Sequence, residues 1–137
     1  MTGYQIPKTP SAYEFPLLIR YLLSRLSAQH AGQQIVYGGE LRFRYEEFFD
    51  RVQRLANGLK DLGIGPGDTV AVMDWDSHRY LECFFAVPMI GAVLHTINVR
   101  LAPEQILYTI NHARDTALLV HDDFVPRDVE LLDLGLD

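Results

Sequence analysis

The stretch "GIGPGDTVAVM", residues 63–73, decides the fold class because it joins two kinds of apolar pattern. Before it, apolar side chains over residues 45–62 recur at steps of three and four, which predicts a helix that ends at Gly63. After it, "TVAVM" predicts a short buried strand over Thr69–Met73. A phosphate-binding loop needs the opposite order, a strand followed by glycines and then a helix whose first amides face the anion. The glycines therefore predict a connecting turn in which Asp68 accepts hydrogen bonds from nearby backbone amides.

Strands and helices alternate through the rest of the chain. Further strands are predicted at 92–97 and 117–120, with helices at 78–90 and 103–113. Ser77 is placed to cap the first of these helices, and Pro103 suits the first position of the second. This alternation is typical of right-handed βαβ units on a parallel sheet, so the predicted class is α/β.

The part of the chain before residue 45 follows another pattern. "QIVYGGELRFRY", residues 34–45, predicts a short hairpin with a two-residue turn at Gly38-Gly39. Within 17–32, Leu18, Tyr21, Leu22, Arg25 and Leu26 lie at helical spacing and predict a helix that ends near Gly32. Residues 1–16 contain three prolines and are predicted to form an extended N-terminal arm.

Composition excludes several classes of protein. The 137 residues carry 12 Lys and Arg against 18 Asp and Glu, a net charge of −6, and no basic stripe, so a nucleic-acid partner is not expected. The single cysteine, Cys83, allows no internal disulfide, which fits a cytoplasmic protein. The N-terminus does not read as a signal peptide, and no apolar run reaches the length of a membrane span.

Residues with catalytic potential are few and scattered. The five histidines, His30, His78, His95, His112 and His121, show no metal-binding spacing. "HDD" at 121–123 is interpreted as a loop with solvated acids, and Cys83 as a core thiol. His95 and Thr96 lie at the carboxyl end of a strand, where α/β proteins often place function, but His95 is interpreted as a partly buried histidine with a hydrogen-bond partner. The sequence therefore assigns no catalytic, cofactor-binding or metal-binding residue.

Two stretches together resemble a known family. "YEEFFDRVQRLANGLKDLGIGPGDTVAVM" is similar to the early part of adenylate-forming (AMP-binding) enzymes. "HRYLECFFAVPMIGAVLHTINVRLAPEQILYTINHARDTALLVHDD" resembles the bacterial long- and medium-chain fatty-acid–CoA ligases more particularly. The likeness covers residues 33–124.

The resemblance implies an enzyme that converts a fatty acid, ATP and CoA to acyl-CoA, AMP and pyrophosphate through an acyl-adenylate, with Mg²⁺ as cofactor. The family's phosphate loop, a Thr/Ser/Gly-rich segment ending in Pro-Lys-Gly, does not occur in this sequence, nor do the later nucleotide motifs. Residues 17–137 are therefore expected to be part of an N-terminal domain truncated before the phosphate loop, structural and not catalytic. The sequence departs from the family at Asn98-Val99-Arg100, where Asn-Pro-Arg is usual, and at Arg44 and Ala102, where a capping Ser or Thr is usual.

Two alternatives stay open from the residues. The chain could be a stand-alone oligomerisation module that uses the arm 1–16, or part of a ligase for an aryl or other small carboxylic acid. As an isolated part of a large domain, the chain is expected to expose apolar surface that supports self-association or binding to the remainder of the enzyme.

Overall fold

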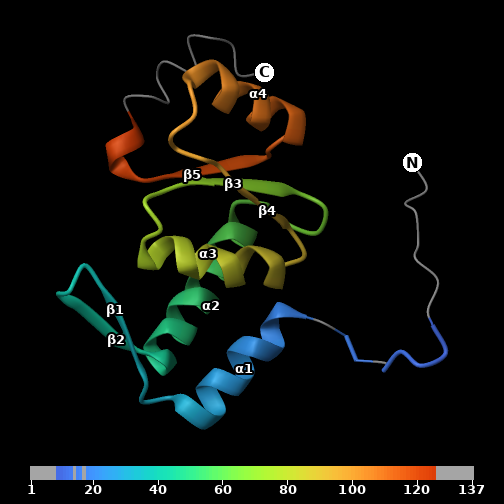
Figure 1. The fold of residues 1–137 in the computed structure, drawn as a ribbon, viewed down its shortest axis with the longest axis vertical. Coiled ribbons are helices and arrows are strands. Elements are labelled where there is room, and N and C mark those ends of the chain that lie inside the picture. Colours follow the sequence, from blue (N-terminus) through green and yellow to red (C-terminus); the bar gives the residue numbers. More distant parts are fainter. Residues whose placement is uncertain (1–8, 14, 17, 126–137) are drawn as a thin grey trace.

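The structure is a computed structural model that describes residues 9–13, 15–16 and 18–125. Its elements, coloured along the chain in Figure 1, are α1 (Ile19–His30), β1 (Gln34–Tyr37), β2 (Leu41–Arg44), α2 (Tyr45–Asp61), β3 (Thr69–Met73), α3 (His78–Met89), β4 (Val93–Thr96), α4 (Pro103–Ala113), β5 (Ala117–Val120) and the short 3₁₀ helix η1 (Asp122–Phe124). Residues 1–8 and 14 of the predicted arm lie outside the described part, and its boundary at residue 16 stays a prediction. Residues 126–137, where the sequence predicted no element, also lie outside the described part.

A three-stranded parallel sheet in the order β4-β3-β5 confirms the α/β prediction. β3 is the central strand, and Val70 to Met73 are all buried because both faces of this strand are covered. α3 and α4 lie on opposite sides of the sheet (Figure 1). One core cluster includes residues of α2 and α3, and a second lies between the sheet and α4 around Ala71 and Ile106.

The hairpin forms as predicted, but its turn is longer. β1 and β2 pair antiparallel with Tyr37 opposite Leu41, so the turn has three residues, 38–40, and the prediction of a two-residue turn was wrong. Gly38 and Gly39 both have positive φ (63° and 79°), which explains the pair of glycines.

The two first helices show where periodicity succeeded and where it failed. Along α2, the buried residues Phe48, Val52, Ala56 and Leu59 belong to the predicted stripe. On α1 the buried residue is Leu23 (2% exposed), which the pattern omitted, whereas Leu22 is 60% exposed. The contacts of α1 with α2 and α3 therefore decide that Leu23 and not Leu22 is buried.

The glycine loop 63–68 is a connector, as predicted. Gly63 (φ 87°) ends α2, and the Gly65 amide donates a hydrogen bond to Asp68 Oδ2 at 2.8 Å. Pro66 packs on Gly91, and the Gly67 amide donates to the Gly91 carbonyl at 3.1 Å. The loop thus ties the start of β3 to the start of β4.

The helix starts are satisfied in two ways. Ser77 Oγ accepts the amides of Arg79 and Tyr80 and caps α3, as predicted. At α2, the cap position Arg44 donates its own amide to Glu47 Oε2 at 2.6 Å, although its side chain makes no cap bond. Ala102 does the same toward Gln105 at the start of α4. Side chains three residues into each helix therefore offset part of the missing Ser or Thr caps.

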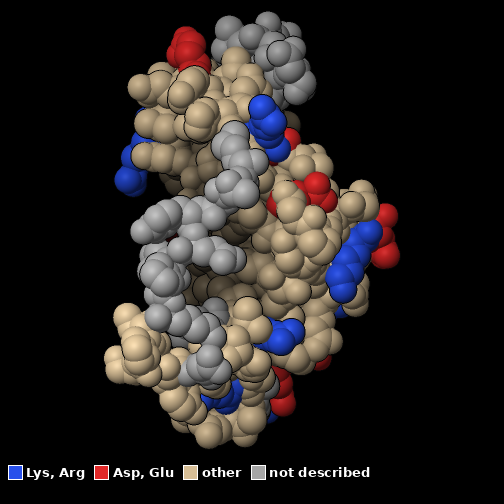
Figure 2. All heavy atoms as spheres, turned by 90° about the vertical axis from the view of Figure 1, so that its right-hand side faces the viewer, with Lys and Arg blue, Asp and Glu red and all other residues tan. Residues whose placement is uncertain are grey.

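The surface of the described part carries charge of both signs. Figure 2 shows Lys, Arg, Asp and Glu scattered over one face among uncharged residues. No helix among the described residues is long and apolar enough to cross a membrane. Several large apolar side chains are exposed, among them Leu62 (77%) and Tyr108 (66%), as expected for a chain with uncovered surface.

Candidate functional site

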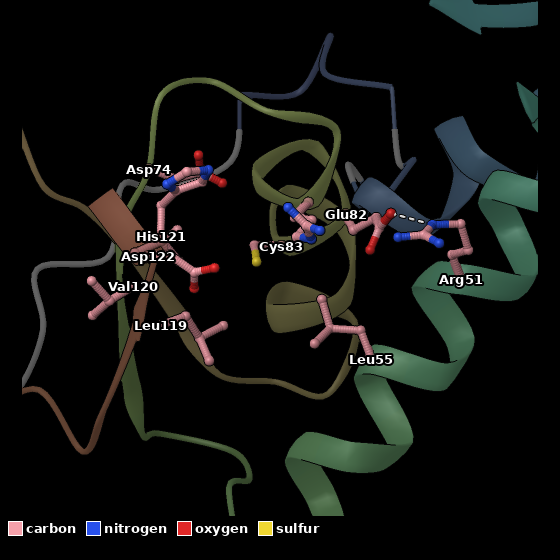
Figure 3. A pocket seen from close by; sticks show the side chains of 11 residues that line it. Arg51, Leu55, Asp74, Glu82, Cys83, Leu119, Val120, His121 and Asp122 are labelled. Atoms are coloured by element: carbon pink, nitrogen blue, oxygen red, sulfur yellow. Dashed lines mark hydrogen bonds and ion pairs between the residues drawn. The ribbon is translucent and has the colours of Figure 1, made fainter. Parts of the chain in front are cut away.

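A pocket of about 390 Å³ opens at the carboxyl ends of β3 and β5 (Figure 3). In parallel sheets this edge is where ligands bind. α2 and α3 form its wall. The lining residues are Arg51, Leu55, Val72, Asp74, Arg79, Glu82, Cys83, Leu119, Val120, His121 and Asp122.

An ion pair spans the helical wall of the pocket. Arg51 Nε of α2 lies 2.5 Å from Glu82 Oε1 of α3, and the Glu82 side chain is only 7% exposed. The same guanidinium lies over the Phe43 ring at 5.8 Å. A buried carboxylate needs such a partner, so the pair holds α2 against α3 and is not available to activate a substrate. No sequence spacing predicts this pair, because positions 51 and 82 are 31 residues apart.

The carboxylate at the end of β3 is also engaged. Asp74 Oδ1 accepts the Trp75 amide and Oδ2 accepts the Ser77 hydroxyl, each at 2.5 Å. Asp74 therefore braces the turn from β3 into α3, where Asp76 has a positive φ of 54°. An Asp directly after a buried strand and three residues before a capping Ser is the sequence signal that would have found this brace.

The segment "HDD" starts a short 3₁₀ helix. His121 Nδ1 accepts the Asp123 amide at 3.2 Å, and Asp122 and Asp123 are exposed. Trp75 Nε1 donates to Asp123 Oδ2 at 2.9 Å, and the Trp75 ring packs 4.6 Å from Phe124. These contacts join the loops after β3 and β5, in keeping with a structural role for the segment.

Cys83 is a core thiol, as predicted. It is 4% exposed, and burial, with smaller effects from Glu82 and Asp74, raises its pKa to about 12. Such a thiol stays protonated at neutral pH and is a poor nucleophile.

His95 and Thr96 are neighbours in the sequence but have different surroundings in the structure. His95 Nδ1 lies 2.7 Å from Asp115 Oδ2, which confirms the prediction of a partly buried histidine with a partner. Burial raises the pKa of Asp115, and the hydrogen bond from His95 partly opposes this. Thr96 instead lines a second pocket of about 350 Å³ between the ends of β3 and β4. Beside it, Asn98 Oδ1 accepts the Arg100 amide at 3.0 Å and braces the loop that lacks the usual proline.

No group of three His, Cys, Asp or Glu residues in the described part of the chain could hold a metal ion. The glycine-rich loop precedes a strand, so no helix N-terminus faces it. Three of the histidines have separate partners: His95 lies against Asp115, His121 accepts the Asp123 amide, and His78 packs on Tyr37.

The sequence of the chain is similar to curated CoA ligases. The long-chain-fatty-acid–CoA ligase of Thermus thermophilus is 44% identical over 108 residues, which cover 76% of this chain and 20% of that enzyme. The medium-chain-fatty-acid–CoA ligase of Ectopseudomonas oleovorans is 38% identical over 119 residues, or 84% of this chain and 22% of that enzyme. The chain therefore spans about a fifth of the length of these relatives.

Solved structures share the fold. The anthranilate CoA ligase AuaEII, in complex with anthranoyl-AMP, matches with a TM-score of 0.80 at 24% identity, over 87% of this chain and 23% of that one. The N-terminal domain of FACL13 from Mycobacterium tuberculosis matches with a TM-score of 0.77 at 22% identity, over 85% of this chain and 30% of that one. The model of the family described as AMP-binding enzyme matches residues 23–134. With the parallel sheet and the glycine turn in their expected places, the chain belongs to the AMP-binding enzyme family.

Proposed function

We propose that this chain is an N-terminal structural part of an ATP-dependent fatty-acid–CoA ligase. Two observations support this proposal. The chain is 44% identical to a long-chain enzyme over most of its length, and its sequence does not contain the Pro-Lys-Gly phosphate loop. The whole enzyme would use ATP, Mg²⁺ and CoA to convert a fatty acid to acyl-CoA through an acyl-adenylate. In this proposal residues 17–137 contribute scaffold, residues 1–16 form an arm, and no residue here is catalytic or binds nucleotide or metal.

The geometry supports a scaffold role. In the pocket at the ends of β3 and β5, Glu82 is paired with Arg51 and Asp74 is held by Ser77. Polar groups committed to internal bonds stabilise the helices and turns and offer a substrate little that is reactive. We place the protein in the cytoplasm, in keeping with its single cysteine and its family.

The alternatives have less support. A stand-alone oligomerisation module does not account for the family match over residues 23–134. A ligase for an aryl acid is compatible with a relative such as the trans-cinnamate:CoA ligase of Petunia hybrida, which is 35% identical, but the long-chain enzyme is more similar.

Activity measurements on the purified chain test the proposal. We expect no acyl-CoA when the 137-residue chain is incubated with Mg-ATP, CoA and fatty acids of several lengths. Turnover above a boiled control would refute the scaffold role. Genomic sequence beyond codon 137 tests the assignment separately: a Thr/Ser/Gly-rich segment ending in Pro-Lys-Gly in the same frame supports it.

A further inference from the structure

His78 is a buried polar side chain whose Nδ1 has no hydrogen-bond partner among the residues that the structure describes. It is the first residue of α3 and is 9% exposed. Two rings of the hairpin enclose it: the Tyr37 ring centroid lies 5.3 Å away and that of Phe43 5.7 Å away. A buried polar atom without a partner is rare in folded proteins and needs an explanation.

The neutral imidazole fits this site and the charged one does not. A protonated ring carries a donor on both nitrogens, and Nδ1 has no acceptor. The two carboxylates nearby are already engaged, Glu82 by Arg51 and Asp74 by Ser77 and the Trp75 amide. Burial, followed by the charge of Arg79, lowers the pKa of His78.

Charged and titratable groups surround this ring on several sides. They are Arg79 and Glu82 of α3, Arg51 of α2, Asp74 of the β3–α3 loop, Tyr37 of β1 and, around an adjoining pocket of about 330 Å³, Arg42, Glu47, Asp50 and Arg54. The arginines oppose a positive ring, whereas the carboxylates favour it. Because Glu82 and Asp74 already bind other donors, the balance leaves the ring neutral.

Few other contacts hold the end of the hairpin that carries the turn at residues 38–40. A two-stranded hairpin alone is only marginally stable in water. Along β1 only Ile35 is partly buried, and on β2 only Phe43 is buried. Tyr37 rests on His78, whereas Phe43 lies against His78 and also stacks on the Phe48 ring of α2 at 6.3 Å. The state of the His78 ring therefore acts mainly on the docking of the Tyr37 end of the hairpin.

We propose that the contact of His78 with Tyr37 and Phe43 is a proton-sensitive latch, which releases the β1–β2 hairpin from the start of α3 when His78 is protonated. The latch goes beyond the proposed function and does not depend on it. Since the docked state favours the neutral ring, docking is complete above pH 6.5, the pKa of a free imidazole, and weakens as the pH falls below it. At pH 5.0 the protonated form of a free imidazole exceeds the neutral form by about 30 to 1. The ratio of open to docked hairpin therefore increases by at most about 30-fold.

Amide hydrogen exchange tests the latch on the full chain. After correction for intrinsic rates, we expect exchange over residues 34–44 to be several-fold faster at pH 5.0 than at pH 7.5, while Thr69–Met73 stays protected. His78→Phe keeps a ring but cannot be protonated, and should abolish this pH dependence. His112→Phe on α4, which replaces a ring stacked on Tyr108, is the matched control and should retain it. Equal hairpin exchange at both pH values, or an unchanged pH dependence in His78→Phe, would overturn the latch, as would loss of protection over the whole sheet at pH 5.0.

A second measurement does not need the variant to fold. Titration of the His78 ring protons by NMR in the unmodified chain should give a pKa below that of a free imidazole. Tyr37→Ala, at a residue 36% exposed, should shift it back upward because water reaches the ring. A normal pKa in the unmodified chain would refute the latch.

Discussion

Replacing Arg51 by Met should destabilise the chain more than replacing both members of its ion pair. Arg51→Met keeps much of the apolar stem but removes the guanidinium that lies 2.5 Å from Glu82. Breaking a buried pair costs about 3–5 kcal/mol, because an unpaired charge is left in the interior. The Arg51 side chain is 35% exposed, so water reaches the site, and we expect a reduced loss of about 2–3 kcal/mol.

The double variant gives the decisive comparison. Adding Glu82→Leu removes the stranded carboxylate, and apolar replacements of buried pairs are often neutral. We therefore expect Arg51→Met with Glu82→Leu to regain at least about 1 kcal/mol over Arg51→Met alone. Glu46→Gln is the control, since its pair with Arg44 is about half exposed and contributes about 0.5 kcal/mol or less.

Urea unfolding measures all four proteins. Far-UV circular dichroism and the fluorescence of Trp75, the single tryptophan, give two independent transitions. The slope with urea should stay constant, so that shifts in midpoint report stability. An Arg51→Met variant within about 0.5 kcal/mol of the parent, or a further loss on adding Glu82→Leu, would refute the reasoning.

Three further predictions concern single sites. Burial raises the pKa of Asp115, so the folded state favours the protonated carboxyl, and the stability that this gives is lost as the pH rises through that pKa. From pH 4 to 6, the urea midpoint of the parent chain should therefore fall relative to that of Asp115→Asn. A constant difference between the two midpoints would contradict this. The Cys83 thiol, with its pKa of about 12, should not react with a disulfide reagent at pH 8 until urea unfolds the chain; rapid reaction of the native chain would show that it is accessible. Gly91→Ala should cost more than about 1 kcal/mol in thermal or urea unfolding, because φ is 85° and the new Cβ would lie 3.2 Å from Pro66. The control Gly58→Ala, on an open part of α2, should stabilise by about 0.5–1 kcal/mol, and equal effects at the two glycines would contradict the account.

Periodicity predicted the elements where one side of a segment faces a core. The strands at Thr69–Met73 and Ala117–Val120 and the helix Pro103–Ala113 agree with the prediction to the residue. Residues with a local preference mark the ends of other elements: Ser77 caps α3, and Gly63, with positive φ, ends α2. Local conformational preferences need no partner elsewhere in the chain, so the sequence reveals them.

The candidate site was much less predictable. Asp74 and His121 reach one pocket because β3 and β5 are neighbours in the sheet, although β4 separates them in the sequence. The partners of Arg51 and His95 lie 31 and 20 residues away, and no spacing rule connects such positions. Whether a histidine is reactive or merely paired depends on those partners, which the fold supplies.

The amino-acid sequence by itself determined the α/β class, the connecting role of the loop "GIGPGDTV" and the family, since all three depend on the order of elements along the chain. Only the tertiary structure decided that Leu23 and not Leu22 is buried on α1, and that His78 Nδ1 has no hydrogen-bond partner among the described residues. Burial and hydrogen bonding are properties of contacts between distant segments. They arise when those segments pack, because the strand order places them side by side and excludes water from between them.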